Sequence, residues 1–464
     1  MTDDTSYTGG STVDPNESEE ANSARRVAAI SAALEAGDGD ELRTLTQGLR
    51  APDLADVIEL LEPDERVQLI ETLGTAFDPE VMSELEETVR DQLVEALPND
   101  VLARVITQLD TDDAAYVLEN LEAADQQDIL AQMPSSDRLA LERNLEYPEE
   151  TAGRLMQTDF VAVPPFWTVG RVIDHMRETE DLPETFTDIF VVDPSYRVIG
   201  KIDLSRLLRT KRSVLVQIIM EADQHTVAAT VDQEELARQF ERYDLKSAPI
   251  VDANQRLVGV VTVDDIVEVI EEETDEDLRR LAGVGDESIG DSVASTARSR
   301  FLWLTINLAT AILASGVIKL FDASIEHMVA LAVLMPIVAS MGGNAATQTM
   351  AVTVRALATE DLGPVNTMRV IWREAAVGLI NGFAFAAILG VVVFFWFGVG
   401  PLGAVIAAAM IINLFSAAIA GILIPIGLER AGFDPAVASG TFVTTITDVV
   451  GFFAFLGLAT VVLL

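Results

Sequence analysis

Five long apolar stretches fill the C-terminal part of the chain and limit what it can fold into. Each reaches the roughly 20 residues that a helix needs to cross the hydrocarbon core of a bilayer. Because backbone polar groups inside a bilayer must be paired within the segment, we expect helices. The stretches are Phe301–Phe321, Met328–Ala358, Ala375–Phe397, Leu402–Leu428 and Ala436–Leu464. The sequence therefore predicts an all-α, five-helix transmembrane domain over residues 299–464.

Basic residues at the ends of these stretches predict the orientation, because cytoplasmic loops are enriched in Lys and Arg. If the N-terminal part of the chain is cytoplasmic, only Lys319 lies on the outer side. The inner side then holds Arg298, Arg300, Arg355, Arg369, Arg373 and Arg430. We therefore expect a multi-pass protein of the plasma membrane, in contact with lipid, whose N-terminal domains are cytoplasmic.

The charge of the chain is unevenly distributed. There are 31 Lys and Arg against 74 Asp and Glu, a formal net charge of -43, yet the mean hydropathy is +0.29. From Arg298 onward bases and acids nearly balance, so the negative charge belongs to the N-terminal part. An anionic surface repels phosphate, which argues against nucleic acid as a partner, and it suits multivalent cations. Adaptation to salt explains the same acidity, and the sequence leaves that alternative open.

The remaining composition excludes several classes of site. The sequence has no cysteine, which rules out disulfides, thiolate metal sites and thiol catalysis. Its three histidines, His175, His225 and His327, lie outside the middle of the apolar stretches, so we do not expect an enzyme. The first residues are polar and acidic, which predicts a disordered acidic tail over residues 1–24 and no signal peptide.

A repeat of twelve residues runs through residues 25–150. Helix-starting residues follow several of its positions, as in Glu62-Pro63-Asp64 and Pro98-Asn99-Asp100. The pattern predicts a superhelical array of short helices that pack their leucines against their neighbours, a scaffold rather than a catalytic domain. The repeated positions are Leu49, Leu61, Leu73, Leu85, Leu97, Leu109, Leu121, Met133 and Leu145.

After the array, short β-branched runs alternate with helical segments. Val191-Val192-Asp193 and Ile250-Val251-Asp252 match each other at a constant offset. This predicts two tandem α/β modules of the form βαββα, over residues 151–212 and 213–272. Both resemble CBS modules, which pair and often bind adenosine nucleotides.

The second module carries the family's spacing of glycine, threonine and aspartate in Gly259-Val260-Val261-Thr262-Val263-Asp264. The resemblance therefore implies ATP or AMP at Thr262 and Asp264. The first module departs from the pattern with Gly200-Lys201-Ile202-Asp203, so one cleft at most is complete. The alternative is that Asp264 simply caps the helix that follows.

Carboxylates crowd the segment that joins the second module to the first apolar stretch. Asp265 and Glu268 share one helix face, and so do Glu273, Glu276 and Asp277, with no base before Arg279. A solvated acidic helix explains this pattern. Clustered oxygen ligands directly before a membrane span also suit a divalent cation, which favours a regulatory metal site. We place this connecting helix at residues 273–298.

Polar residues inside the apolar stretches indicate an ion pathway. A carboxylate at the position of Asp448 costs about 2.5–3.5 kcal/mol on insertion scales, and no base lies near the centre of any stretch. Asp448 is therefore protonated, or it faces water and a cation, as the nearby Thr444 and Thr445 suggest. In the second stretch, Pro336 and the pair Gly342-Gly343 predict a loosened helix, tolerated where it lines a cavity.

The order of these parts resembles the MgtE family of Mg²⁺ channels from about Arg25 to the C-terminus. The most specific elements are Met341-Gly342-Gly343-Asn344 and the run from Asp434-Pro435-Ala436 through Thr444-Thr445 to Asp448. The resemblance implies a homodimer with an axial pore in which Asp448 holds hydrated Mg²⁺, lined by Gly342, Gly343, Asn344, Thr444 and Thr445. It also implies gating by cytoplasmic Mg²⁺ bound to Glu234, Asp244, Asp265, Glu268, Glu273, Glu276 and Asp277. Departures are Glu268, where Asp is usual, and Thr441, where Pro is common.

Two other functions are compatible with the sequence. In the first, the permeant ion is another divalent cation, Co²⁺ or Mn²⁺, and the same cytoplasmic domains regulate its passage. Alternatively, the chain is a membrane-anchored sensor of nucleotide or cation that conducts nothing. An anion pathway is disfavoured, because it requires Arg or Lys within the membrane.

Overall fold

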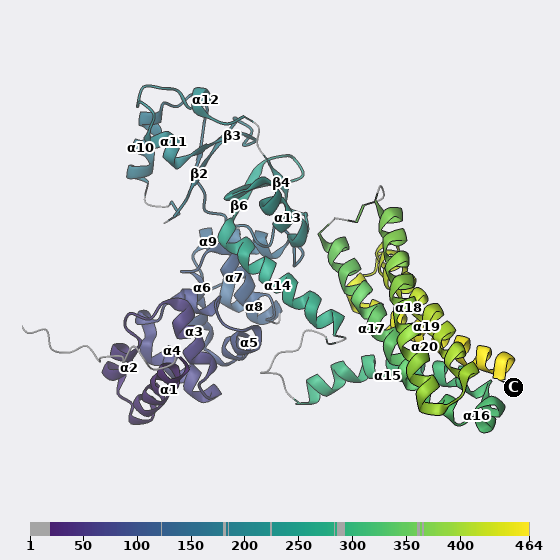
Figure 1. The fold of residues 1–464 in the computed structure, drawn as a ribbon. Coiled ribbons are helices and arrows are strands. Elements are labelled where there is room, and N and C mark those ends of the chain that lie inside the picture. The colour runs from purple at the N-terminus through teal and green to yellow at the C-terminus, as the bar shows by residue number, and fades with distance from the viewer. Residues whose placement is uncertain are drawn as a thin grey trace, which may run out of the picture. The chain divides into compact units, whose positions relative to one another are not determined.

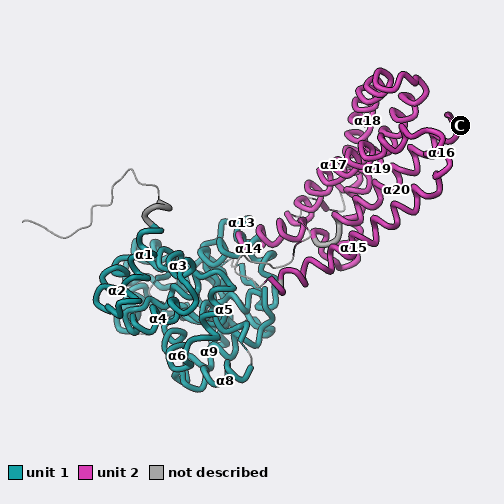
Figure 2. The backbone as a smooth tube through the Cα atoms, turned by 90° about the horizontal axis from the view of Figure 1, so that it is seen from below, with its two compact units in different colours: residues 1–270 teal, residues 271–464 magenta. Residues whose placement is uncertain are grey.

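The computed structural model describes residues 19–463 except 122, 180, 181, 184, 223, 224, 283, 285–292, 360, 361, 364 and 365, and it does not describe the side chains of 19–22, 295 and 437–439. Residues 1–18 of the predicted tail and most of residues 283–292 of the predicted connecting helix therefore lie outside the described residues. The chain forms two compact units, residues 1–270 and 271–464 (Figure 2).

The first unit begins with the helical array (Figure 1). All the positions of the twelve-residue repeat lie in one hydrophobic core or pack against it, which confirms the predicted array. The helices are α1 (Glu19–Ala36), α2 (Gly39–Thr46), α3 (Ala51–Glu59), α4 (Pro63–Leu73), α5 (Glu87–Ala96), α6 (Asn99–Ile106), α7 (Thr111–Leu118), α8 (Ala123–Leu130) and α9 (Ser135–Leu145), with 3₁₀ turns η1 (Gly74–Ala76) and η2 (Pro79–Met82) after α4.

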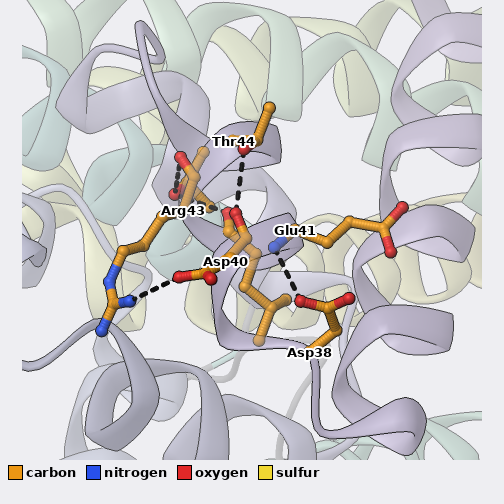
Figure 3. A network of polar contacts seen from close by, with 7 residues as sticks. Asp38, Asp40, Glu41, Arg43 and Thr44 are labelled. Atoms are coloured by element: carbon orange, nitrogen blue, oxygen red, sulfur yellow. Dashed lines mark hydrogen bonds and ion pairs between the residues drawn. The ribbon is translucent and has the colours of Figure 1, made fainter.

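Many acids of the array serve the ends of these short helices. Figure 3 shows the start of α2, where an Asp38 carboxylate oxygen accepts a hydrogen bond from the Glu41 backbone N–H at 3.1 Å. In the next turn Arg43 pairs with Asp40 at 3.2 Å. Acids near a helix N-terminus satisfy unpaired N–H groups and favour the helix dipole. Part of the negative charge therefore has a structural use and is no evidence of a ligand.

Two small α/β modules complete the first unit. In each sheet the first two strands are parallel and the last two antiparallel, and the register of the second sheet repeats that of the first. Asp188 pairs with Asp203, and the equivalent Ser247 pairs with Thr262. This confirms the tandem βαββα modules. Their elements are β1 (Ala162–Val163), α10 (Val169–Glu178), β2 (Asp188–Val192), β3 (Val198–Asp203) and α11 (Leu204–Leu208), then α12 (Val216–Ile219), β4 (Val227–Ala228), α13 (Gln233–Tyr243), β5 (Ser247–Val251), β6 (Leu257–Thr262) and α14 (Val263–Leu281).

The second unit contains the end of α14 and the membrane helices. Among the residues that the structure describes, five helices are long and apolar enough to cross a bilayer, which confirms the predicted all-α, five-helix architecture. The central helix is α19, which packs against α17, α18 and α20. The helices are α15 (Val293–Lys319), the short α16 (Asp322–His327), α17 (Ala330–Ala358), α18 (Thr367–Phe397), α19 (Gly400–Arg430) and α20 (Pro435–Leu463).

Candidate functional site

A cluster of carboxylates lies between helix α7 and the start of α14, within the first unit. Asp112 and Asp113 belong to the first turn of α7, and Asp265 and Glu268 to the first turns of α14. Burial, together with the charges of Asp265 and Glu268, raises the pKa of Asp113 to about 7. Burial and the charge of Asp265 also raise the pKa of Asp112 well above its usual range. A bound cation would relieve both the desolvation and the repulsion.

Asp265 has two roles in this cluster. Its Oδ2 accepts hydrogen bonds from the backbone N–H of Thr262 at 3.0 Å and from the Thr262 hydroxyl at 2.8 Å, which caps α14. Burial nevertheless raises the pKa of Asp265 to about 6, because these bonds only partly offset it. The carboxylate that begins the helix is thus also the charge that faces α7.

The acids of α7 are absent from the metal ligands that the sequence predicted. The run Asp110-Thr111-Asp112-Asp113 is visible in the sequence, but locally it indicates only a helix start. Its place in the carboxylate cluster depends on its proximity to Asp265, which lies far along the chain. Within the described residues, no three His, Asp or Glu side chains are grouped so that they could hold a metal ion. Mg²⁺ usually keeps several waters and needs only one or two carboxylates.

A second group of carboxylates lies in the other unit, where the end of α14 meets the start of α20. Arg280 Nη1 lies 2.7 Å from Asp434 Oδ2, and the same guanidinium pairs with Glu276. Asp434 Oδ1 accepts a hydrogen bond from the Ala436 N–H at 2.7 Å, so Asp434 caps α20. Burial and the charge of Asp434 raise the pKa of Asp277. Like the acids of α7, Asp434 is absent from the predicted ligands, although it is the acid nearest the start of the last span.

Glu234 and Asp244 are not brought together in the chain. Glu234 lies in the first turn of α13 and pairs with Arg238 at 3.5 Å. Asp244 follows the last turn of the same helix, in a left-handed conformation with φ of 50°. Ten residues of helix separate them by about 15 Å. A regulatory role for either residue stays a prediction, and it requires a ligand from another surface.

In the membrane domain, Asp448 lies on a face of α20 that carries hydroxyl groups. Helical spacing puts Thr441, Thr444 and Asp448 on one side, and Asp448 is half-buried. The Thr444 hydroxyl donates to Gly440 O at 2.9 Å, and the Thr445 hydroxyl donates to Thr441 O at 2.6 Å. A hydroxyl whose proton is used in this way presents its lone pairs outward. These hydroxyls and the Asp448 carboxylate therefore offer oxygen acceptors, which suit the waters around a cation.

The predicted loosening of the second span is not observed, because α17 runs unbroken through Pro336 and Gly342-Gly343. The residues of the Gly342-Gly343-Asn344 motif instead lie on different faces of α17. Gly342 is buried and packs against Asn413 of α19, whereas Asn344 is exposed. On α15, Asn307 Oδ1 accepts a hydrogen bond from the Thr441 hydroxyl at 2.9 Å. Asn307 is absent from the residues predicted from the sequence, where its signal is a single amide within the first apolar stretch.

The predicted nucleotide residues are only partly grouped. Thr262 lines a small cleft between the two modules, together with Gln157, Asp188 and Ser247. Asp264 is exposed, is not among the residues that line this cleft, and shares the proton of the Thr262 hydroxyl with Asp265. The cap of α14 is provided by Asp265 rather than by Asp264. A nucleotide at Thr262 and Asp264 stays a prediction.

Three family models match the chain. They are a divalent cation transporter model over residues 335–458, the MgtE intracellular N domain over 49–150, and the CBS domain over 152–213 and 216–272.

The chain is also similar to characterised proteins. The magnesium transporter MgtE of Bacillus subtilis is 33% identical over 70% of this chain and 72% of its own length. The magnesium transporter MgtE of Thermus thermophilus is 34% identical over 70% of this chain and 73% of its own. A crystal structure of the cytosolic domain of the Mg²⁺ channel MgtE in complex with ATP is 31% identical, covers 52% of this chain and 99% of that one, and has a TM-score of 0.49.

Proposed function

Because this chain belongs to the MgtE family of magnesium transporters, we propose that it conducts Mg²⁺ across the membrane and that cytoplasmic Mg²⁺ closes the path. The observation that carries this proposal is Asp448, a half-buried carboxylate on a hydroxyl-bearing face of a membrane helix. Polar groups at such a depth are expensive and are kept for function. Its neighbours are oxygen acceptors, which favours a hydrated cation as the ligand.

The path lies between two copies of the chain in this proposal. Each copy contributes Asp448, Thr444 and Thr445 from one side of α20, and two carboxylates hold the ion through its waters. Mg²⁺ releases its waters reluctantly, so a pair of carboxylates that accepts hydrogen bonds from those waters suits it. Larger ions that lose water more readily would fit this arrangement less well.

Regulation is exerted through α14, which contributes to both carboxylate groups. A cation near Asp113 and Asp265 links α7 to the start of α14. A cation near Asp277 and Asp434 links the end of α14 to α20, the helix that carries Asp448. Without cations, these acids repel one another and weaken the closed arrangement.

The number of acids is reasonable for such a gate. Reversing an equilibrium from 1:99 to 99:1 requires about 5.5 kcal/mol of differential binding. A tenfold preference for the closed state at one site contributes about 1.4 kcal/mol. About four modest sites are therefore sufficient, and a homodimer doubles the sites of each chain.

The test of permeation is Mg²⁺ influx into proteoliposomes that contain a Mg²⁺-sensitive dye. We expect Asp448→Asn to abolish influx, because the charge that attracts the hydrated ion is lost. The matched control is Glu326→Gln, which neutralises an exposed acid of α16 in the same domain and is expected to leave influx unchanged. Influx through Asp448→Asn at the wild-type rate would overturn the proposal.

A further inference from the structure

The side chain of Asn413 is fully buried in the membrane domain. It lies on the central helix α19, and its amide Nδ2 donates a hydrogen bond to Val338 O of α17 at 2.8 Å. Its Oδ1 has no hydrogen-bond partner in the described part of the chain. Burying an amide among apolar helices is costly, and one cross-helix bond returns only part of that cost. The residue is therefore poorly explained by stability alone.

Two glycines on different helices make room for this amide. A Cβ on Gly342 of α17 would lie 2.3 Å from Asn413 Nδ2, and a Cβ on Gly451 of α20 would lie 2.8 Å from the same atom. Both distances are well inside van der Waals contact. The amide thus lies between two helix backbones, and any side chain at either glycine displaces it.

The contact with Gly451 is close to Asp448 on the same helix. Val443, Thr447, Gly451 and Phe455 follow one another at steps of four and are all buried, so they form the packing face of α20. Asp448 follows Thr447 and is turned away from that face by about 100°, the rotation of one helical residue. A slip of α20 by one residue would therefore rotate the carboxylate by about the same angle.

We propose that Asn413 is a positioning residue of the ion path, which fixes the depth and rotation of Asp448 by holding α17 and α20 against α19. The same amide fixes α17 at Gly342, next to Gly343 and Asn344. Asn413 itself does not touch the ion. The inference rests on the proposed function for its transport readout, but its geometry stands independently of transport.

The experiment is a size exchange between Asn413 and Gly451, made in the full-length protein. Gly451→Ala introduces a clash with the amide, and we expect Mg²⁺ influx to fall at least tenfold, with a lower melting temperature in detergent. Asn413→Ala removes the amide and leaves space for a methyl group. The double variant is expected to melt above Gly451→Ala and to regain most of the influx of Asn413→Ala, since neighbouring sites that share space are not additive.

Selectivity separates positioning from mere packing. Asn413→Leu keeps the volume and loses the amide, so we expect it to fold and to show at least a threefold change in the ratio of Mg²⁺ to Co²⁺ influx. The control is Gly427→Ala on the same helix, where an added Cβ meets nothing within 4 Å. It is expected to leave melting, influx and the ratio unchanged.

The outcomes distinguish this inference from the proposed function. If wild-type proteoliposomes conduct no Mg²⁺, the proposed function fails. The melting temperatures of the Asn413 and Gly451 variants still test whether the two residues hold the helices together. If the change in melting temperature of the double variant equals the sum of the two single changes, the contact between Asn413 and Gly451 does not hold the helices together. If Gly451→Ala and Asn413→Leu both keep the wild-type influx and ratio, the positioning role is refuted whatever the melting data show.

Discussion

Replacing Asp113 by Asn tests the carboxylate cluster between α7 and α14. Burial and the charges of Asp265 and Glu268 raise the pKa of Asp113 to about 7, against an ordinary value of about 3.9. Because the pKa of Asp113 is raised in the folded state, its protonation contributes stability that is fully present below about pH 4. This contribution is lost as the pH rises through about 7. Without metal at pH 8, ionised Asp113 therefore costs up to about 4 kcal/mol, at 1.36 kcal/mol for each pKa unit.

Relaxation of the cluster reduces the gain from Asp113→Asn to about 2 kcal/mol, because Asp265 and Glu268 share the repulsion. In a unit of this size, that raises the unfolding midpoint by about 4–8 °C. The substitution has the opposite effect on the stabilisation that Mg²⁺ provides. At ten times its dissociation constant, Mg²⁺ stabilises the wild-type protein by about 1.4 kcal/mol, and Asp113→Asn loses most of that stabilisation.

The assay is thermal unfolding of the full-length protein in detergent at pH 8, first with a chelator and then with Mg²⁺. Asp128→Asn is the control, because it neutralises an exposed acid on α8, and we expect a midpoint within about 1 °C of wild type. A midpoint for Asp113→Asn at or below wild type in the chelator, or an unchanged Mg²⁺ effect, refutes the reasoning.

Two further predictions concern pH and the second carboxylate group. Between pH 8 and pH 5.5, Asp113 and Asp265 take up protons, so the metal-free midpoint rises and Mg²⁺ binding weakens at least tenfold, as calorimetry can measure. Asp434→Asn removes the acid that caps α20 and pairs with Arg280, and we expect half-inhibition of influx to require severalfold more internal Mg²⁺. Unchanged half-inhibition contradicts a role for Asp434 in closure.

The sequence predicted the elements well because each carries its own local signal. The twelve-residue repeat, the matching β-strands and the five apolar stretches all reflect periodicity within a short window. The orientation of Glu273, Glu276 and Asp277 on one half-buried helix face also follows from spacing alone.

Contacts between distant segments were not predictable in this way. Asp112 and Asp113 read locally as a helix start, and only packing against α14 gives them a common partner in Asp265. Pro336 and the glycine pair predict a loosened helix by local propensity, yet packing against Asn413 uses Gly342 for a close approach instead. No local signal separates a glycine that loosens a helix from one that admits a neighbour.

The most direct measurement is Mg²⁺ influx into proteoliposomes while free Mg²⁺ is varied on the side of the N-terminal domains. We predict rapid influx at low free Mg²⁺ and a steep fall as the carboxylate groups fill, with half-inhibition moving to higher Mg²⁺ in Asp113→Asn. No influx at any concentration would contradict permeation through this chain. Influx that does not respond to Mg²⁺ on that side would contradict the gate.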